Sequence, residues 1–160
     1  MEYMNINFVE MINQTTGEFA EKFEKRNLQI VLNVPEKPVM VRTDGRRMWR
    51  VIENIYNNAA KYALEGTRVY ADLIEKEHTV EFSLKNISEQ PLNISADELT
   101  ERFIRGDVSR STEGSGLGLS IAKNLTELQG GKFELYLDGD LFKVTIVFPK
   151  AVVGQSVTKP

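Results

Sequence analysis

The chain has 160 residues, a length that suits a single domain with one hydrophobic core. Its 20 basic and 23 acidic side chains give a net charge of −3, so the composition indicates neither a nucleic-acid-binding nor a membrane-binding surface. The sequence has no apolar run of membrane-spanning length and no signal peptide at Met1, and the absence of cysteine excludes disulfides and thiolate zinc sites. We therefore expect a cytoplasmic domain.

The first elements follow from the spacing of apolar residues. Apolar side chains at helical intervals predict an amphipathic helix over residues 8–25, and an apolar run at 28–34 predicts a strand. Pro35 and Pro38 then break the chain before a short strand at residues 39–41.

A long helix and a hairpin are predicted next. Asp44 is placed to cap a helix over residues 45–64, and Gly66 lies just beyond its end. Alternating apolar and polar residues at 68–75 and at 79–85 predict two strands joined by a tight turn.

The stretch from residue 87 to 113 has little periodicity, apart from a candidate helix at residues 95–103. Long unpatterned loops inside a small domain are usually functional or disordered. Beyond this stretch we expect a helix over residues 117–129, ended by two glycines, and a final hairpin formed by residues 132–137 and 141–148.

These elements predict an α/β fold, of the α+β kind, built as a two-layer sandwich. A mixed, mostly antiparallel sheet would be covered on one face by about three helices. The domain is expected to span residues 1–150, followed by a polar tail at 151–160. Four aromatic residues are expected in the core, as is usual for apolar side chains at regular spacing: Trp49, Phe133, Phe142 and Phe148.

Three glycines at alternate positions, Gly114, Gly116 and Gly118, lead directly into the predicted helix at 117–129. Glycines let backbone amides approach an anion, and the positive end of the helix dipole favours negative charge. The pattern is typical of a phosphate-binding loop, although a flexible loop that caps a helix has the same sequence features.

The long helix at 45–64 carries a polar stripe beside its apolar one. Asn54, Asn58 and Lys61 share this stripe, roughly 120° around the helix from the centre of the apolar face. Asparagine is a poor helix former, so its repetition is typical of a binding site, although by itself a merely solvated face is the commoner explanation of such a stripe. Amide oxygens can ligate Mg²⁺, and a lysine one turn further on can contact the phosphates that the metal bridges.

With both motifs on one chain, the sequence resembles the nucleotide-binding domain of sensor histidine kinases, within the superfamily that also holds DNA gyrase, mismatch-repair ATPases and a heat-shock chaperone class. The asparagine-rich helix is similar to the family's N box, and the three glycines are similar to its second glycine box. Residues 101–111 resemble the phenylalanine-box segment that joins the ATP lid. The resemblance extends over about residues 7–149 and implies an ATP-binding fold of the Bergerat type.

The resemblance also implies a role for each matching residue. Asn58 would hold Mg²⁺, Asn54 would orient the metal or the acceptor, and Lys61 would contact phosphate. Tyr62 would stack on or hydrogen-bond the nucleotide, with a place in the core as the alternative. The other expected ATP contacts lie in the glycine loop and the lid: Gly114, Gly116, Leu117 and Gly118 around the phosphates, Phe103 packing the lid, and Arg105 and Arg110 closing on the phosphates.

One segment departs from the family pattern. The family normally has an Asp-x-Gly-x-Gly box, whose aspartate accepts a hydrogen bond from the adenine amino group, but residues 85–91 contain no glycine. If Asn86 takes the place of that aspartate, its amide oxygen still accepts the bond without charge assistance, so we expect weakened adenine recognition. Leu141 and Phe142 replace the Gly-Thr that the family often carries, which leaves the secondary adenine contacts open.

The activity implied by the resemblance is transfer of the ATP γ-phosphate to a histidine, in two-component signal transduction. The hydrolytic relatives place a catalytic glutamate one turn before the metal-binding asparagine, but here that position is Asn54, and Glu53 is rotated by about 100°. This disfavours a hydrolase. The only histidine, His78, falls in a predicted turn, so the acceptor is expected on a separate domain.

The expected partners are the dimerisation and phosphoacceptor domain of a homodimeric, membrane-anchored parent protein, and a response regulator. That domain and any sensor domain are absent from this sequence, and no contact with nucleic acid or directly with the membrane is expected. Two alternatives stay open: a degenerate nucleotide-binding regulatory module without phosphotransfer, and an ATPase clamp of the same superfamily.

Overall fold

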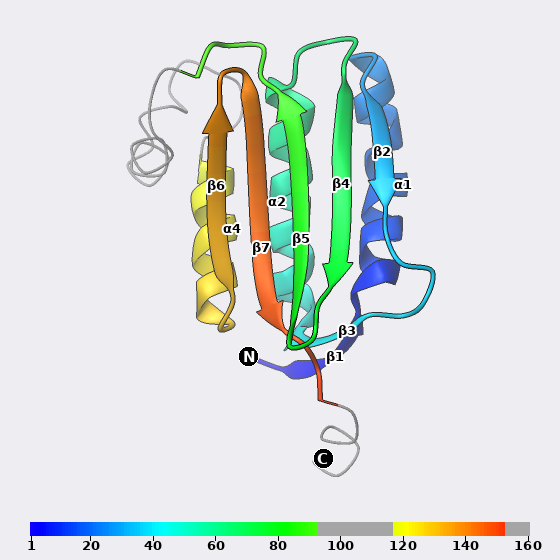
Figure 1. The fold of residues 1–160 in the computed structure, drawn as a ribbon, viewed down its shortest axis with the longest axis vertical. Coiled ribbons are helices and arrows are strands. Elements are labelled where there is room, and N and C mark those ends of the chain that lie inside the picture. The colour runs from blue at the N-terminus through cyan, green and yellow to red at the C-terminus, as the bar shows by residue number, and fades with distance from the viewer. Residues whose placement is uncertain (93–116, 153–160) are drawn as a thin grey trace.

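A computed structural model describes residues 1–92 and 117–152 of the chain. Figure 1 shows two layers, a sheet and the helices behind it. In chain order the elements are β1 (Tyr3–Asn7), α1 (Phe8–Lys25), β2 (Gln29–Asn33), β3 (Met40–Asp44), α2 (Gly45–Tyr62), β4 (Arg68–Glu75), β5 (Thr79–Ile87), α4 (Leu117–Leu128), β6 (Lys132–Asp138) and β7 (Leu141–Pro149).

The main sheet has five strands in the order β2-β4-β5-β7-β6. β2 pairs with β4 in parallel, and the other neighbours pair antiparallel. Helices α1, α2 and α4 lie on the same face of this sheet (Figure 1). The predicted two-layer fold, with a mixed and mostly antiparallel sheet, is therefore confirmed.

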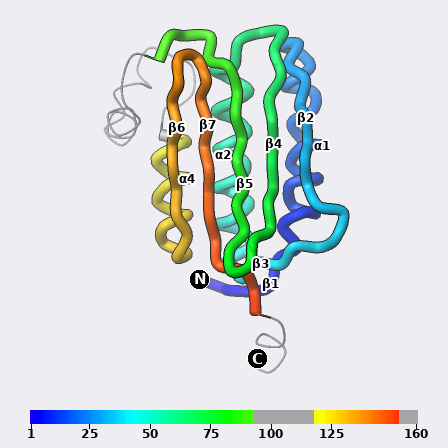
Figure 2. The backbone as a smooth tube through the Cα atoms, viewed as in Figure 1, coloured from blue at the N-terminus to red at the C-terminus, as the bar shows by residue number. Residues whose placement is uncertain are grey.

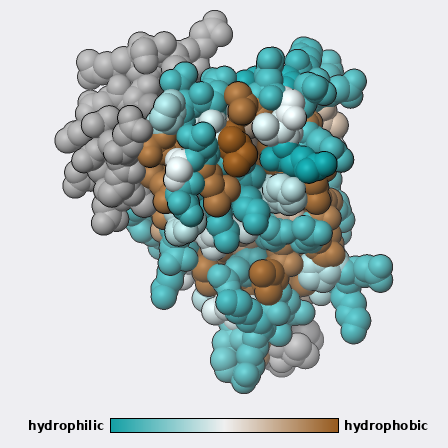
Figure 3. Space-filling model, turned by 45° about the horizontal axis from the view of Figure 1, so that its top comes forward, coloured by the Kyte–Doolittle hydropathy of each residue, from teal (hydrophilic) through white to brown (hydrophobic). Residues whose placement is uncertain are grey.

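Alternation along the central strands explains why only one face of the sheet is covered. On β5, Val80, Phe82 and Leu84 are buried under the helices, whereas Glu81 and Lys85 are only partly covered. Side chains on a strand point alternately to its two faces, so this pattern gives one apolar and one mixed face. The uncovered face and the upper end of the molecule are mostly hydrophilic, with scattered apolar residues (Figure 3).

An aromatic cluster joins the first two helices to the centre of the sheet. Tyr56 of α2 is fully buried, and its ring stacks on that of Phe82 at a centroid distance of 6.2 Å and on that of Phe23 at 6.2 Å. The hydroxyl of Tyr56 lies 2.7 Å from that of Thr16 on α1. Burial raises the pKa of Tyr56 to about 12, against the smaller opposing effect of the hydrogen bond to Thr16. Tyr56 therefore stays neutral and binds α1 to α2.

The side chain of Asp44 caps the start of α2 and links three parts of the chain. It accepts hydrogen bonds from the backbone N–H groups of Glu2, Arg46 and Arg47, and the Arg47 guanidinium donates to it at 2.8 Å. These hydrogen bonds lower the pKa of Asp44 to about 2, and the largest effects come from the bonds donated by the backbone amides of Glu2 and Arg47. The backbone N–H of Asp44 donates to Gln129 Oε1 at 3.0 Å, just beyond α4. The predicted capping role of Asp44 is thus confirmed.

A small second sheet, formed by β1 and β3, was not expected from the sequence. Its strands pair antiparallel from Tyr3 opposite Asp44 to Asn7 opposite Met40. β1 lacks a buried face, because Tyr3 and Met4 are 44% and 52% exposed, so no alternating pattern marks it. The backbone N–H of Ala151 donates to the carbonyl of Met40 at 3.1 Å, so both ends of the described chain meet at β3 (Figure 2).

Some predicted details need correction. Trp49 is only half-buried and lies outside the core cluster, because it sits about 100° around α2 from Met48, which is fully buried. Phe133 is also half-buried, on β6 at the sheet edge, although it packs against the core. Phe142 and Phe148 are buried, as expected.

Element boundaries agree closely with the expected ones. α1 and β4 have the predicted bounds, whereas α2 ends at Tyr62, two residues early, because Ala63 is extended and forms a bridge with Ser88. The candidate helix at 95–103 lies outside the described residues.

Candidate functional site

Two faces of α2 have different environments. The predicted apolar stripe is confirmed, because every member is at most 1% exposed: Met48, Ile52, Ile55, Ala59 and Ala63. On the other face, Asn54, Asn58 and Lys61 are each half-buried. A half-buried polar stripe is partly screened from water yet still open to a ligand, which is the environment that a polar binding site requires.

The beginning of α4 lies directly against the polar stripe of α2. A Cβ built on Gly118 would lie 3.9 Å from Oδ1 of Asn54. Nδ2 of Asn54 is buried and has no hydrogen-bond partner among the described residues. A buried amide without a partner costs free energy, so such groups in folded proteins usually have a functional reason or a missing ligand. The fold thus brings the asparagine motif and the last glycine of the glycine motif together.

Asn86 lies near the carboxyl end of β5, on the face covered by the helices. It is 4% exposed and continues the buried row formed by Phe82 and Leu84. In the pairing of β5 with β7 it stands directly opposite Phe142, which is 6% exposed. Directly opposed residues share a sheet face, so an amide and an aromatic ring line this position together.

Backbone hydrogen bonds fix the end of α2 to the end of β5. The N–H of Leu64 donates to the carbonyl of Ile87 at 2.7 Å, and the N–H of Glu89 donates to the carbonyl of Tyr62 at 2.9 Å. The N–H of Ser88 donates to the carbonyl of Asp140 in the β6–β7 turn at 2.7 Å. Lys61 and Tyr62, both half-buried, are therefore held at the same end of the sheet as Asn86.

Arg26 supports this end of α2, a role that no pattern in the sequence predicted. Its guanidinium donates to the carbonyls of Ala60 and Lys61, at 2.9 and 3.0 Å, and forms an ion pair with Glu89 at 3.1 Å. A cation at a helix C-terminus satisfies carbonyls that have no partner within the helix and interacts well with its dipole. The bonded residues lie more than thirty positions apart, so no local pattern could indicate the contact.

The remaining predicted site residues lie outside the described part of the chain. They are Phe103, Arg105, Arg110, Gly114 and Gly116. Leu117 is described as the first residue of α4, but its side chain is not.

The side chains of the polar stripe suit a metal ion that binds together with the phosphate groups of a ligand. Within residues 1–92 and 117–152, no group of three or more His, Cys, Asp or Glu residues is placed to hold a metal ion. Mg²⁺ rarely uses a cage made wholly of protein groups and commonly takes one or two protein oxygens together with phosphate oxygens. The half-buried amide oxygen of Asn58 fits that mode, whereas the unpartnered Nδ2 of Asn54 is a hydrogen-bond donor and suits a phosphate oxygen or a water molecule instead.

A separate cavity lies away from these residues. It has a volume of about 570 Å³ and is lined by Asn27, Gln29, Gly66, Thr67, Arg68, Tyr70 and Ile87. None of the predicted site residues lines it. Tyr70, whose ring lies 5.4 Å from Nζ of Lys85, stands on the uncovered face of the sheet. This cavity is therefore distinct from the polar stripe of α2.

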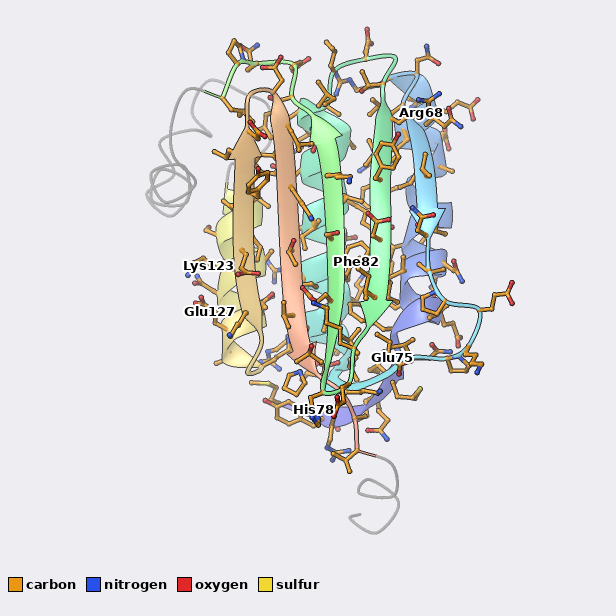
Figure 4. All side chains as sticks on the ribbon, in the orientation of Figure 1. Arg68, Glu75, His78, Phe82, Lys123 and Glu127 are labelled. Carbon is orange, nitrogen blue, oxygen red and sulfur yellow. The ribbon has the colours of Figure 1, made fainter. Side chains whose placement is uncertain are left out.

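His78 lies far along the sheet from the polar stripe. It sits in the turn between β4 and β5, at the opposite end from Ile87 (Figure 4), with its side chain 85% exposed. The carbonyl of His78 accepts from the N–H of Lys150, which bridges Val41 of β3 near the start of α2. The expectation that His78 is a solvent-facing turn residue is confirmed.

None of the described helices combines the length and the apolar character that a membrane crossing requires.

Comparisons with known proteins bear directly on this site. Residues 43–152 match the family model of histidine kinase-, DNA gyrase B- and HSP90-like ATPases. The chain is 33% identical over 148 residues to the sensor protein KdpD of Clostridium acetobutylicum and 30% identical over 142 residues to the sensor protein VanSC of Enterococcus gallinarum. These alignments cover 86% and 88% of this chain, but only 16% and 39% of the two relatives.

The fold is similar to that of solved kinase domains. A nucleotide-free structure of the catalytic domain of histidine kinase ThkA superimposes with a TM-score of 0.81 at 26% identity, covering 94% of this chain and 97% of that domain. The similarity therefore extends over a whole catalytic domain of ThkA, whereas the chain spans less than half the length of the two sensor proteins.

Proposed function

Because this chain belongs to the family of histidine kinase-, DNA gyrase B- and HSP90-like ATPases, we propose that it binds Mg·ATP and donates the γ-phosphate to a histidine on a separate dimerisation domain. The parent protein would be a homodimeric sensor histidine kinase of a two-component system, and a response regulator would receive the phosphoryl group. Sensor-kinase relatives and the similarity to the ThkA catalytic domain support this assignment.

The observation that carries the proposal is the approach of α4 to the polar stripe of α2. Nδ2 of Asn54 is buried and has no hydrogen-bond partner among the described residues, and Gly118, which has no side chain, lies beside this asparagine. We assign Asn58 to Mg²⁺, Asn54 to orientation of the metal or acceptor, and Lys61 to a phosphate oxygen. The amides at the start of α4, with Gly114 and Gly116 before them, would bind phosphate at the positive end of the helix dipole.

The chain's contribution to the reaction would be positioning and neutralisation of charge. In phosphoryl transfer the bond from the γ-phosphorus to the bridging oxygen breaks while a bond to the acceptor forms, and ADP leaves. Bound Mg²⁺ would supply charge neutralisation between the β- and γ-phosphates. Lys61 would add a second positive charge, and Arg105 and Arg110 of the lid segment would close on the same phosphates.

Adenine would bind at the carboxyl end of β5. The amide oxygen of Asn86 can accept a hydrogen bond from the adenine amino group, and the ring of Phe142 opposite it offers an apolar surface to the base. Tyr62, held next to this strand end by the bond from Glu89, would stack on or hydrogen-bond the nucleotide.

Transfer to a histidine, rather than to water, is favoured by the residue at position 54. An ATPase clamp needs a carboxylate to activate water one turn before the metal-binding asparagine, and an amide cannot act as that base. A degenerate regulatory module that binds ATP without transferring phosphate remains the second candidate, because residues 85–91 lack the glycines of the family's first glycine box.

Phosphotransfer in trans tests the proposal. The purified chain would be incubated with γ-labelled ATP, Mg²⁺ and the separately produced dimerisation domain of the parent protein. We expect acid-labile label on that domain, lost when its acceptor histidine is replaced by glutamine and when the kinase chain carries Asn58→Ala. ATP binding without label would favour the regulatory module, and release of inorganic phosphate without label would favour the clamp.

A further inference from the structure

The inference concerns β6, the strand at one edge of the main sheet. β6 pairs with β7 on one side, and on its other side no strand is present among the described residues. Figure 1 shows it as the outermost strand, with α4 behind it. An edge strand presents unpaired N–H and C=O groups in the geometry that another strand can bind.

β6 lacks two devices that commonly block such pairing. Its register with β7 runs without interruption from Lys132 opposite Val147 to Asp138 opposite Leu141, so it contains no bulge. Its seven residues also contain no proline. The strand is therefore regular enough to accept a further strand along its whole length.

The side chains of β6 divide into two sets by face. Those on the uncovered face are exposed: Lys132, Glu134, Tyr136 and Asp138. Those on the helix side are half-buried against the core: Phe133, Leu135 and Leu137. In an antiparallel pair, directly opposed residues lie on the same face of the sheet. Any correct register for a second strand must therefore place exposed residues opposite exposed ones.

We propose that β6 pairs antiparallel with β6 of a second copy of this chain, about a two-fold axis through Leu135. This register places Lys132 opposite Asp138 of the other copy, and Asp138 opposite its Lys132. On the uncovered face, Glu134 then stands opposite Tyr136. On the helix side, Phe133 stands opposite Leu137. The resulting sheet would be continuous across the two copies and would have two-fold symmetry.

Neighbouring registers are much less favourable. Shifting the axis to Glu134 sets the two Glu134 carboxylates opposite each other, and shifting it to Tyr136 sets Glu134 opposite Asp138. Like charges directly opposed across strands are destabilising. Shifts beyond these leave only three residues of each strand paired, so the Leu135 register is the one that joins the full strand with opposite charges.

The helix behind β6 is consistent with this contact. α4 packs against β6, and Leu128 at its last residue is 56% exposed. Lys123 and Glu127 form an ion pair along the outer side of α4, 2.8 Å apart (Figure 4). An exposed leucine beside the half-buried side of β6 extends the apolar surface that a second copy would cover.

A single pair of seven-residue strands forms a small interface, so association should be weak. It would become significant where two copies are held close together, because tethering raises their effective concentration. It would add a second point of self-association to the proposed homodimeric parent protein.

Cross-linking by register tests the proposal, since the chain has no cysteine of its own. In the proposed register, Cys at position 134 of one copy faces position 136 of the other. Two thiols therefore meet only in a mixed dimer, in which one copy carries Glu134→Cys and the other carries Tyr136→Cys. We expect oxidation of an equal mixture to give disulfide-linked dimers at least about fivefold more abundant than in either variant alone. Equal yields in the mixture and in the separate variants would contradict the register.

Charge reversal gives an independent measurement by sedimentation velocity of the full chain. Lys132→Glu should lower the dimer fraction, and adding Asp138→Lys should restore it, because the exchanged charges again stand opposite each other. Lys37→Glu, in the exposed loop before β3, is the matched control and should leave the dimer fraction unchanged. A monomer at every concentration up to about 1 mM would overturn the proposal.

Discussion

In the proposed ATP-binding mode, Asn86 is the residue that departs from the family pattern. Its side chain is nearly fully buried, opposite Phe142, and carries no charge. A carboxylate accepts a hydrogen bond more strongly than an amide does, since charge-assisted bonds are about twice as strong as neutral ones. In the proposed mode, adenine recognition therefore depends on the neutral amide oxygen of Asn86 and on the apolar ring of Phe142 opposite it.

We predict that Asn86→Asp tightens ATP binding by about five- to tenfold, since it adds charge assistance to the bond from the adenine amino group. It should also lower the stability of the nucleotide-free protein, because a buried carboxylate without a partner costs free energy. Isothermal titration with a non-hydrolysable ATP analogue measures the first effect, and urea unfolding measures the second.

Asn13→Asp, the same change at an exposed position on α1, should leave ATP affinity unaltered. GTP provides a second control, because guanine has a carbonyl where adenine has the amino group. If Asn86→Asp strengthens GTP binding as much as ATP binding, or weakens ATP binding, Asn86 does not contact the adenine amino group.

Tyr56 has a structural role that is separable from nucleotide binding. We expect Tyr56→Phe to lower the free energy of unfolding by about 1 kcal/mol, through loss of its hydrogen bond to Thr16, while the aromatic stack with Phe82 is kept. ATP affinity should not change. Tyr70→Phe, on the uncovered face of the sheet, should have little effect on stability, and a comparable loss there would show that the Thr16 bond is not the cause.

At the scale of single residues, local patterns predicted part of the arrangement of the candidate site. The helical period alone placed Asn54, Asn58 and Lys61 on one half-buried stripe. The support from Arg26 and the contact between Asn54 and Gly118 could not be predicted, because both depend on how distant elements pack.

At the scale of elements, the junction of α2 with α4 forms the proposed phosphate site, and Gly118 lies beside Asn54 there. We predict that Gly118→Ala raises the free energy of unfolding by about 0.5–1 kcal/mol, because alanine is favoured over glycine within a helix. The same methyl group would stand near Oδ1 of Asn54 and should weaken Mg·ATP binding.

Gly17→Ala is the matched control for this change. Gly17 lies within α1, is exposed, and has no atom within 4 Å of the position of an added Cβ. It should raise stability by a similar amount in urea unfolding without any change in nucleotide affinity. Equal ATP affinity in Gly118→Ala and the wild type would show that phosphate does not approach α4 at this glycine.

The Asp44 cap couples α2 to β1 and to the end of α4, and its contribution should depend on pH. The folded pKa of about 2 lies below the ordinary value of 3.8, so the ionised carboxylate stabilises the fold. That contribution is fully present above about pH 4 and is lost as pH falls toward 2. Asp44→Asn should therefore lower the urea midpoint at neutral pH, and the difference from wild type should narrow between about pH 4 and 2. A difference that stays constant over this range would contradict a lowered pKa.

Element prediction succeeded where one face of the element is buried. α1 and α2 each bury a regular apolar stripe, and β4 and β5 alternate clearly, so periodicity located all four. β1 is exposed or half-buried along its whole length and owes its strand form to pairing with β3. Such a strand has no signal of its own in the sequence.

At the scale of the whole molecule, one end of the two-layer fold gathers the proposed ATP contacts. The end of α2, the end of β5, the turn between β6 and β7 and the start of α4 meet there, joined by the bonds of Tyr62, Leu64 and Ser88. β1, β3 and the turn that carries His78 lie at the opposite end (Figure 4). His78 is therefore far from the proposed ATP contacts (Figure 4), in keeping with the proposal that the acceptor histidine lies on another domain.

The central claim is that the polar stripe of α2 holds Mg·ATP. Isothermal titration with a non-hydrolysable ATP analogue, with and without Mg²⁺, would compare the wild type with Asn58→Ala and Asn57→Ala. Asn57 is the matched control, because it lies one residue before Asn58 on the same helix and accepts a hydrogen bond from Lys22 of α1. We predict Mg²⁺-dependent binding that Asn58→Ala weakens by at least about tenfold and Asn57→Ala leaves intact. No binding by the wild type at millimolar nucleotide, or equal losses in both variants, would contradict the account.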